Sequence, residues 1–283
     1  MMGETRSAVT MMTMNSDFLH STLGRTGIPV CRLGLSGSYW PGQRTFDLAL
    51  DEGVNYFFAC GIDFQTVRAL RGLSAGRREE VVIATGAYNF VWARQDLKKA
   101  LERRLRQLGT DYIDTFHFLG VMKPKHMTPR VMDQLQELRS DPRVKAVSIS
   151  CHDRKFAGQL VADGKLDCIM ARYNAAHRGA ESEIIPALER HGTAMISYTA
   201  TRWGYLIRRS RHWPKERPIP TPGQCYRFVL SNPAVSVCLN LPSNERQFRE
   251  NLAAVRLGPL PEDEMRFMRE YGDVVHAHAG WFM

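Results

Sequence analysis

Eight short apolar segments, separated by amphipathic ones, run through most of this 283-residue chain. The apolar segments are rich in β-branched and aromatic residues, and several contain almost no polar side chain, as expected of strands that are buried on both faces. Eight strands that alternate with helices over about 250 residues predict a (β/α)8 barrel. The strands are expected at Arg32–Leu35, Asn55–Ala59, Val81–Ala84, Tyr112–Leu119, Val144–Ser150, Asp167–Arg172, Ala194–Tyr198 and Val235–Leu239.

The segments between the strands have the periodicity of helices that cover such a barrel. Leu97, Leu101, Leu105 and Leu108 recur at helical spacing, with basic residues on the opposite face. Another helix is expected from Pro261, because proline presets the φ angle of a first turn and the three acidic residues after it favour the positive end of the helix dipole. A doubly wound open sheet is the alternative, but no GxGxxG motif follows the first strand, so the barrel is favoured.

The ends of the chain suggest additions to the barrel. Residues 1–18 are polar and rich in methionine and threonine, and we expect a flexible leader that lacks the apolar stretch of a secretory signal. Residues 23–35 predict an N-terminal β-hairpin with its turn at 24–27, and extra helices are expected at the C-terminal end. Residues 19–283 are expected to form a single barrel domain, because no linker or change of composition divides them.

Composition limits the classes of protein to consider. No apolar run approaches the ~20 residues of a membrane-spanning helix, so no membrane partner is expected. The six cysteines include no CxxC pair, which argues against disulfides and against a zinc site. We therefore expect a reduced, cytoplasmic protein without a metal, and the sequence leaves its oligomeric state open.

The charge of the chain favours anionic ligands. Lysine and arginine number 38 against 29 aspartate and glutamate, a formal net charge of +9. The basic residues do not form one stripe interleaved with aromatic residues, so no nucleic-acid partner is expected. They cluster once, between Arg208 and Arg217, in a proline-bearing loop that could line the entrance for an acidic ligand.

Several segments have the motifs of one family in its order and spacing: Leu23-Gly24-Arg25-Thr26-Gly27-Ile28, Arg32-Leu33-Gly34-Leu35, Glu52-Gly53-Val54-Asn55-Tyr56-Phe57, Leu108–Asp114, Tyr173-Asn174, Ser197–Leu206 and Glu250-Asn251-Leu252. Together they resemble the aldo-keto reductase superfamily. The resemblance extends from about Leu23 to Tyr271. It implies reduction of aldehydes and ketones by NADPH, or by NADH, at the C-terminal face of the barrel, with a small-molecule substrate.

The resemblance predicts an unusual catalytic site. The family uses a tyrosine as proton donor, an aspartate and a lysine that tune its pKa, and a histidine across the site. Aligned on the flanking motifs, these four positions hold Asp63, Phe58, Gly86 and Leu119 respectively. Phenylalanine, glycine and leucine cannot transfer protons, and an ionised Asp63 would repel a developing alkoxide. The usual proton relay is therefore predicted to be absent.

The resemblance implies a cofactor site that is partly retained. Tyr198 occupies the position that stacks on the nicotinamide, Ser150 matches a contact to its carboxamide, and Glu250 and Asn251 match the adenine site. The neighbouring carboxamide asparagine is replaced by Cys151, which we still count among the cofactor-binding candidates.

The predicted phosphate loop differs from the family's in a similar way. Residues 241–244 lack the usual first basic residue, although Arg246 could supply charge. A helix is expected to start here, capped by Ser243 or Asn244, and its exposed N–H groups favour an anion. A strand-six glutamine of the family is replaced by Met170, which offers no amide.

Three residues are candidates to replace the lost relay. Tyr88 lies two residues beyond Gly86, where its hydroxyl could serve as the acid, unless it is only an aromatic residue at the barrel rim. His117 should point the same way as Leu119 but one layer deeper, and a histidine packed in the barrel interior is the alternative. Asp63 is the third candidate.

Further residues at the functional face have open interpretations. Cys151, followed by His152 and Asp153, could form a nucleophilic or metal-binding group, or Cys151 could be an ordinary buried residue. Tryptophans in three loops suit an aromatic-lined pocket, although each could simply cover the core. These are Trp40, Trp92 and Trp203.

The sequence supports three functional hypotheses. The first is an NAD(P)H-dependent oxidoreductase for a carbonyl or alcohol substrate, with a non-standard proton relay. The second is a non-redox lyase, dehydratase or isomerase in the same pocket, since the fold alone does not fix the chemistry. The third is a catalytically inert binding or regulatory subunit, or pseudoenzyme. The first is favoured because the retained cofactor residues support it.

Overall fold

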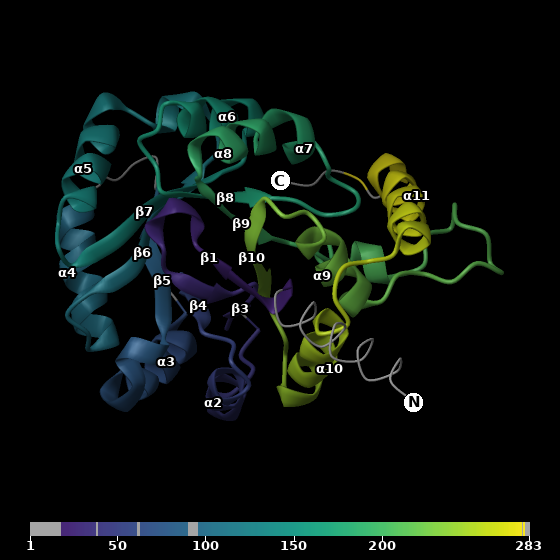
Figure 1. The fold of residues 1–283 in the computed structure, drawn as a ribbon, viewed down its shortest axis with the longest axis horizontal. Coiled ribbons are helices and arrows are strands. Elements are labelled where there is room, and N and C mark those ends of the chain that lie inside the picture. The colour runs from purple at the N-terminus through teal and green to yellow at the C-terminus, as the bar shows by residue number, and fades with distance from the viewer. Residues whose placement is uncertain (1–17, 38, 61–62, 90–95, 279, 281–283) are drawn as a thin grey trace, which may run out of the picture.

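A computed structural model describes residues 18–37, 39–60, 63–89, 96–278 and 280. Eight parallel strands close into a barrel in the order β10-β3-β4-β5-β6-β7-β8-β9, as the sequence predicts (Figure 1). Seven of the eight strands lie within two residues of their predicted limits, and the prediction for β5 was too short. The strands are β3 (Leu33–Ser36), β4 (Tyr56–Ala59), β5 (Val82–Tyr88, which ends four residues beyond its predicted end), β6 (Ile113–Val121), β7 (Val144–Cys151), β8 (Cys168–Arg172), β9 (Ala194–Tyr198) and β10 (Val235–Asn240).

The predicted N-terminal hairpin covers the end of the barrel where the strands begin. Strands β1 (His20–Thr22) and β2 (Pro29–Cys31) pair antiparallel, and a 3-10 turn, η1 (Gly24–Thr26), joins them. The Arg25 backbone N–H donates to the Gly192 carbonyl just before β9 (2.7 Å), and the Cys31 N–H donates to Asn55 just before β4 (2.7 Å). The opposite end of the barrel is therefore the end left for ligands.

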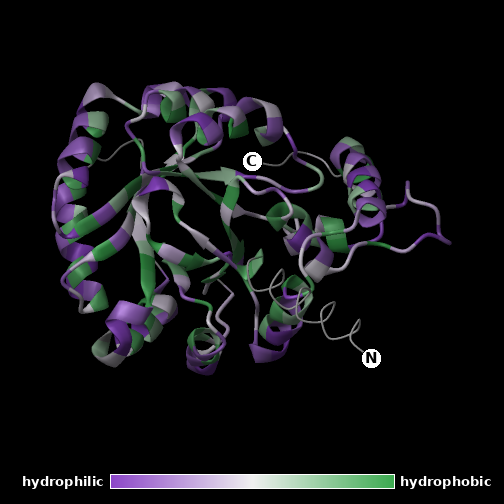
Figure 2. Ribbon diagram, viewed as in Figure 1, coloured by the Kyte–Doolittle hydropathy of each residue, from purple (hydrophilic) through white to green (hydrophobic). Residues whose placement is uncertain are grey.

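Helices surround the barrel (Figure 1). Figure 2 shows hydrophilic residues on the outer sides of the helices and hydrophobic residues along the strands, the pattern of amphipathic helices on a buried sheet. In the described part of the chain, no helix has the length and apolar character needed to cross a bilayer. The helices are α2 (Gln43–Asp51), α3 (Phe64–Arg77), η2 (Arg78–Glu80), α4 (Leu97–Leu108), η3 (Pro124–His126), α5 (Pro129–Arg139), α6 (Arg154–Ala162), α7 (Ala180–Glu183), α8 (Ile185–His191), η4 (Tyr205–Ile207), α9 (Pro222–Leu230), α10 (Glu245–Val255) and α11 (Glu262–His278).

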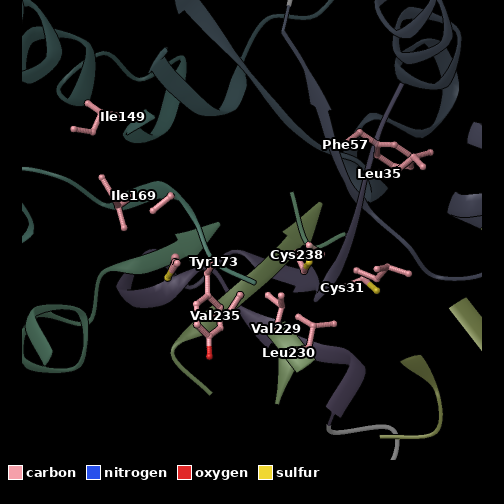
Figure 3. Close-up of a cluster of buried hydrophobic side chains, with 14 of the residues drawn as sticks. Cys31, Leu35, Phe57, Ile149, Ile169, Tyr173, Val229, Leu230, Val235 and Cys238 are labelled. Carbon is pink, nitrogen blue, oxygen red and sulfur yellow. The ribbon is translucent and has the colours of Figure 1, made fainter. Parts of the chain in front are cut away.

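The hydrophobic residues form two separate clusters. The larger one lies between the strands and the helices, and includes Phe57, Ile149 and Ile169 (Figure 3). The smaller one fills the barrel interior and includes Tyr56 and Phe58. Phe57 and Phe58 are neighbours on β4 but belong to different clusters, because successive side chains of a strand point to opposite faces. This alternation decides which residues can reach a site inside the barrel.

The C-terminal helix α11 packs against the loop that follows β9. Its Tyr271 hydroxyl donates to the Arg208 carbonyl oxygen, and the Trp213 ring meets the Tyr271 ring edge-on, with 5.0 Å between the ring centroids. A Cβ atom at Gly272 would lie 2.2 Å from the Ala175 carbonyl oxygen, so only glycine allows this approach of the helix to the chain after β8. The helix thus fixes the loop that forms one wall of the pocket described next.

Candidate functional site

A pocket of about 590 Å³ opens at the C-terminal ends of the barrel strands. Each of the eight strands contributes one side chain to it, which is the usual position of the site in this barrel fold. Four of these side chains are apolar and four carry a hydroxyl group, and two of the four predicted relay positions, Phe58 and Leu119, are among the apolar ones. The eight residues are Ser36, Phe58, Tyr88, Leu119, Ser150, Met170, Tyr198 and Leu239.

Aromatic residues and one arginine lie around the mouth of the pocket. Tyr39, Trp203 and Tyr226 line it, and Tyr39 and Trp203 keep 57% and 47% of their surfaces exposed. Arg208 is exposed and is the one arginine or lysine among the described lining residues, which include no carboxylate. The pocket therefore suits an aromatic or apolar ligand that carries negative charge.

Tyr88 is the relay candidate that the structure places in the pocket. It is the last residue of β5 and pairs with Leu119 of β6. Burial raises the pKa of its hydroxyl, as do the Cys60 thiol, to which it is hydrogen-bonded, and the charge of Asp63; Arg104 acts in the opposite direction. Tyr88 therefore keeps its proton at neutral pH.

Arg104 is a buried cation close to Tyr88. It extends from α4 and is 4% exposed. Its guanidinium donates from Nε to the Gly86 carbonyl oxygen (2.9 Å) and from Nη2 to the Cys60 carbonyl oxygen (3.4 Å). The group is held rigidly behind β5, where its charge favours the ionised form of Tyr88.

His117 lies inside the barrel and does not line the pocket. Its ring is fully buried, with Nε2 3.5 Å from the Tyr56 hydroxyl, and the Phe58 ring lies edge-on against it at 5.7 Å between centroids. Burial lowers the pKa of His117 to about 3. The predicted position one layer below Leu119 is confirmed by the strand register, and the interior packing is the alternative that the structure supports.

Asp63 caps a helix and does not line the pocket. It precedes α3, where its side chain accepts hydrogen bonds from the Thr66 backbone N–H (2.9 Å) and from the Thr66 hydroxyl. Both carboxylate oxygens are thus used by the first turn of the helix. This arrangement explains the aspartate without any catalytic role.

We expect the two roles of Asp63 to be separable by substitution. Asp63→Ala should lower the free energy of unfolding by about 1 kcal/mol, because the cap is lost, whereas Asp63→Asn should change it little, because asparagine also caps helices. Denaturant unfolding measures both. If Asp63→Asn abolished catalysis in a fully stable protein, the capping interpretation would be insufficient.

Three predicted cofactor residues line the pocket: Ser150, Tyr198 and Ser243. Tyr198 ends β9, and its ring forms part of the pocket while its hydroxyl is buried and meets no hydrogen-bond partner among the described residues. Burial raises the pKa of Tyr198 to about 12, and the positive charge of Arg172, followed by the nearby Ser150 side chain, partly opposes this rise. A flat ring beside an alcohol provides a surface and a hydrogen-bonding group for a planar amide.

The predicted phosphate loop does begin a helix. Asn244 is the cap of α10, and its side chain accepts a hydrogen bond from the Gln247 N–H (3.0 Å). The Ser243 N–H donates to the Gln247 side chain (2.8 Å), so Ser243 is not the capping residue. The positive end of the α10 dipole thus lies next to Ser243, which lines the pocket.

The remaining candidates on α10 do not reach the pocket. Arg246 and Glu250 are exposed on one face of the helix, with 4.0 Å between Arg246 Nε and Glu250 Oε1. Asn251 is buried and donates from its side chain to Asn240 at the end of β10 (3.0 Å). The structure therefore gives Asn251 a clear role in holding α10 against the barrel.

Cys151 is not brought to the pocket. The thiol belongs to the hydrophobic cluster outside the barrel, is 1% exposed, and lies 3.2 Å from the Asp153 carbonyl oxygen. Burial raises the pKa of Cys151 to about 12, so it is not a nucleophile at neutral pH. The physical reason is strand alternation, since Ser150 faces inward and its neighbour must face outward.

The residue after Cys151 is the main pocket residue that sequence analysis did not select. His152 lines the pocket, with 6.0 Å between its ring centroid and that of Tyr198. Alternation along β7 could have identified it, because residues 148, 150 and 152 share one face. Trp203 also lines the pocket, whereas Trp40 is 65% exposed outside it and Trp92 lies outside the described residues. In the described part, no group of three or more histidine, cysteine, aspartate or glutamate side chains could hold a metal ion.

Residues 42–273 match the family model "Aldo/keto reductase family". The chain belongs to the aldo/keto reductase family. As a member it is an oxidoreductase of aldo/keto reductase type, which disfavours the non-redox and inert alternatives.

Two oxidoreductases and a solved aldo-keto reductase structure match about nine-tenths of the chain. The NADH-specific methylglyoxal reductase of Escherichia coli is 22% identical over an alignment 321 residues long, which covers 89% of this chain and 98% of that protein. The oxidoreductase YqkF of Bacillus subtilis is 20% identical, and the alignment covers 90% of this chain and 98% of that protein. The holo form of the aldo-keto reductase AKR11C1 from Bacillus halodurans superposes with a TM-score of 0.75 at 20% identity, covering 89% and 95%.

Proposed function

We propose that this aldo/keto reductase binds NADH or NADPH and reduces a small aldehyde or ketone through a rebuilt proton relay. The observation that carries the proposal is the placement of Ser150, Tyr198 and Tyr88, from three strands, in the same pocket. The first two fit the nicotinamide, and the third is a phenol that can donate a proton. The similarity to a methylglyoxal reductase supports a carbonyl substrate.

The residues present fit the nicotinamide end of the cofactor better than its phosphate end. Tyr198 offers its ring to the nicotinamide and Ser150 offers its hydroxyl to the carboxamide, while the α10 dipole favours the phosphates. Arg246, the arginine at the start of α10, lies beside Glu250. We therefore propose that the extra phosphate of NADPH adds little affinity and that NADH binds at least as tightly.

The proposed chemistry divides between cofactor and protein. A nicotinamide held by Tyr198 and Ser150 would supply the hydride that the carbonyl carbon accepts. Tyr88 donates its O–H proton to the carbonyl oxygen, and the resulting phenolate regains a proton from water. Arg104 stabilises that phenolate, so a buried arginine takes the place of the family's lysine. The proposal includes the absence of the usual relay, with Phe58, Asp63, Gly86 and Leu119 at its four positions.

A titration with NADH and NADPH tests cofactor binding. We expect micromolar dissociation constants by calorimetry, and about thirtyfold weaker binding to Tyr198→Ala, because loss of a stacked aromatic ring costs about 2 kcal/mol. Tyr198→Phe is the matched control: it keeps the ring and removes a hydroxyl that meets no partner, so its affinity should stay within threefold. Absence of binding at millimolar cofactor would overturn the proposed function.

A further inference from the structure

His152 is the histidine among the described lining residues of the pocket, and the proposed chemistry gives it no role. It follows β7 directly, on the inward-facing side of the strand that also carries Ser148 and Ser150. Its backbone N–H donates to the Val121 carbonyl at the end of β6 (2.9 Å), and the next residue, Asp153, caps α6. The backbone on both sides is therefore fixed, and the imidazole is held in the pocket.

The two ring nitrogens of His152 have different surroundings. Nδ1 is buried and meets no hydrogen-bond partner among the described residues. A proton on Nδ1 would thus be a buried donor without an acceptor, which is costly. Nε2 is the nitrogen that remains accessible from the pocket that the ring lines. The neutral ring therefore carries its proton on Nε2 and presents an N–H donor to a ligand.

The charges near His152 keep the ring neutral. Burial is the main cause that lowers its pKa, and the positive charge of Arg172 on neighbouring β8 adds to it. On the other side lies Tyr198 of β9, whose raised pKa keeps it uncharged at neutral pH. A neutral imidazole beside a cation can donate a hydrogen bond to an oxygen but is a poor proton donor, so a positioning role suits it better than acid catalysis.

We propose that His152 donates its Nε2–H to the carboxamide oxygen of the bound nicotinamide and so orients the ring on Tyr198. The inference rests on the proposed function. It explains how the site holds a carboxamide although Cys151, at the position of the family's asparagine, faces away from the pocket. Ser150 and His152 approach from the same strand and can together satisfy the oxygen and the amino group of the amide.

Binding measurements with three ligands test this contact. NADH has the whole carboxamide, the reduced 3-acetylpyridine analogue keeps the carbonyl oxygen but lacks the amino group, and ADP-ribose lacks the ring. We expect His152→Phe to weaken binding of the first two by about five- to tenfold, the usual effect of one lost hydrogen bond, and to leave ADP-ribose unchanged. His152→Gln, which restores an amide donor, should recover most of the affinity.

Two outcomes of this experiment would overturn the inference alone. An unchanged NADH affinity in folded His152→Phe would show that no contact exists. An equal loss of ADP-ribose affinity would show that the substitution disturbs the pocket as a whole. If the unaltered chain bound ADP-ribose but neither NADH nor NADPH more tightly than ADP-ribose, the proposed function would fail instead, and the inference with it.

Nitrogen NMR of histidine-labelled protein gives a readout that does not depend on activity. The His152 signal, assigned by its loss in His152→Gln, should show the Nε2–H tautomer at pH 7 and should gain its second proton below the usual pH of about 6.5. Addition of NADH should shift its Nε2 resonance more than its Nδ1 resonance. A ring that gains a proton near pH 6.5, or that carries its proton on Nδ1, would contradict a neutral Nε2 donor.

Discussion

Gly86→Ala should lower the free energy of unfolding by about 3 kcal/mol or more, the cost of forcing an atom into a packed interior. A Cβ atom at Gly86 would lie 1.9 Å from the His117 carbonyl oxygen and 2.7 Å from its carbon. Both atoms belong to the neighbouring strand, to which Gly86 is paired. On its other side the Gly86 carbonyl is held by Arg104 (2.9 Å), so β5 cannot shift to relieve the contact.

A second glycine provides the control for this prediction. Gly72 is exposed in α3, and no atom lies within 4 Å of the place its Cβ would occupy. Gly72→Ala should therefore raise stability by roughly 0.5–1 kcal/mol, through helix propensity alone. Urea unfolding followed by circular dichroism measures both variants. A Gly86→Ala protein within 0.5 kcal/mol of the unaltered one would show that the strand adapts to the methyl group.

The same contact bears on the proposed relay. By resemblance, Gly86 occupies the position of the family's lysine, and any side chain there meets the His117 backbone. We therefore expect Gly86→Lys to destabilise the protein without restoring a lysine-assisted relay. The close approach of the two strands thus leaves no room for a lysine side chain at this position. In the proposed relay a different cation acts on the proton donor, and Arg104 is placed to do so.

The fold could be predicted because its signals are repeated along the chain. Each barrel strand must be apolar on both faces, which gives continuous runs such as Val144–Ser150 that differ clearly from the helical spacing of Leu97 to Leu108. Strand alternation also predicted the depth of His117. The end of β5 was less clear, because Gly86 and Ala87 have a low preference for strands and the strand continues to Tyr88 through its pairing with β6.

The site was harder to predict because the same residue types serve structure and chemistry. Asp63 has the chemistry of a catalytic acid, but an aspartate before a helix is also a cap, and only the coordinates show both oxygens used by Thr66. Arg246 and Glu250 match positions of the family's cofactor site, but they are also four residues apart on a helix, the usual spacing of an ion pair on a helix surface. Cys151 was selected by its alignment with an asparagine, although alternation from Ser150 already favoured His152 as the inward-facing residue.

Tyr88→Phe should lower the rate of carbonyl reduction about a hundredfold, the lower end of the usual contribution of a positioned proton donor. The rate of NADH consumption with methylglyoxal and with an aromatic 1,2-dione measures the change. The dissociation constant of NADH should stay unaltered. Tyr205→Phe is the matched control: this exposed tyrosine of η4 does not line the pocket and its hydroxyl has no assigned role. A Tyr88→Phe enzyme with more than half the original rate would rule out Tyr88 as the donor.

The pH dependence distinguishes Tyr88 from a donor that ionises near neutrality. Its pKa is raised, chiefly by burial, so the phenol keeps its proton through pH 6–9 and the donor form is not depleted as the pH rises through that range. The rate should therefore be flat on its alkaline side until well above pH 9. The raised pKa also makes Tyr88 a weak acid, so proton transfer should be slow and a solvent deuterium isotope effect should appear on kcat. Tyr88→Phe should remove this isotope effect from the residual rate. A rate that fell with an apparent pKa near 7 would assign the proton to another group, and Arg104 would then have no phenolate to stabilise.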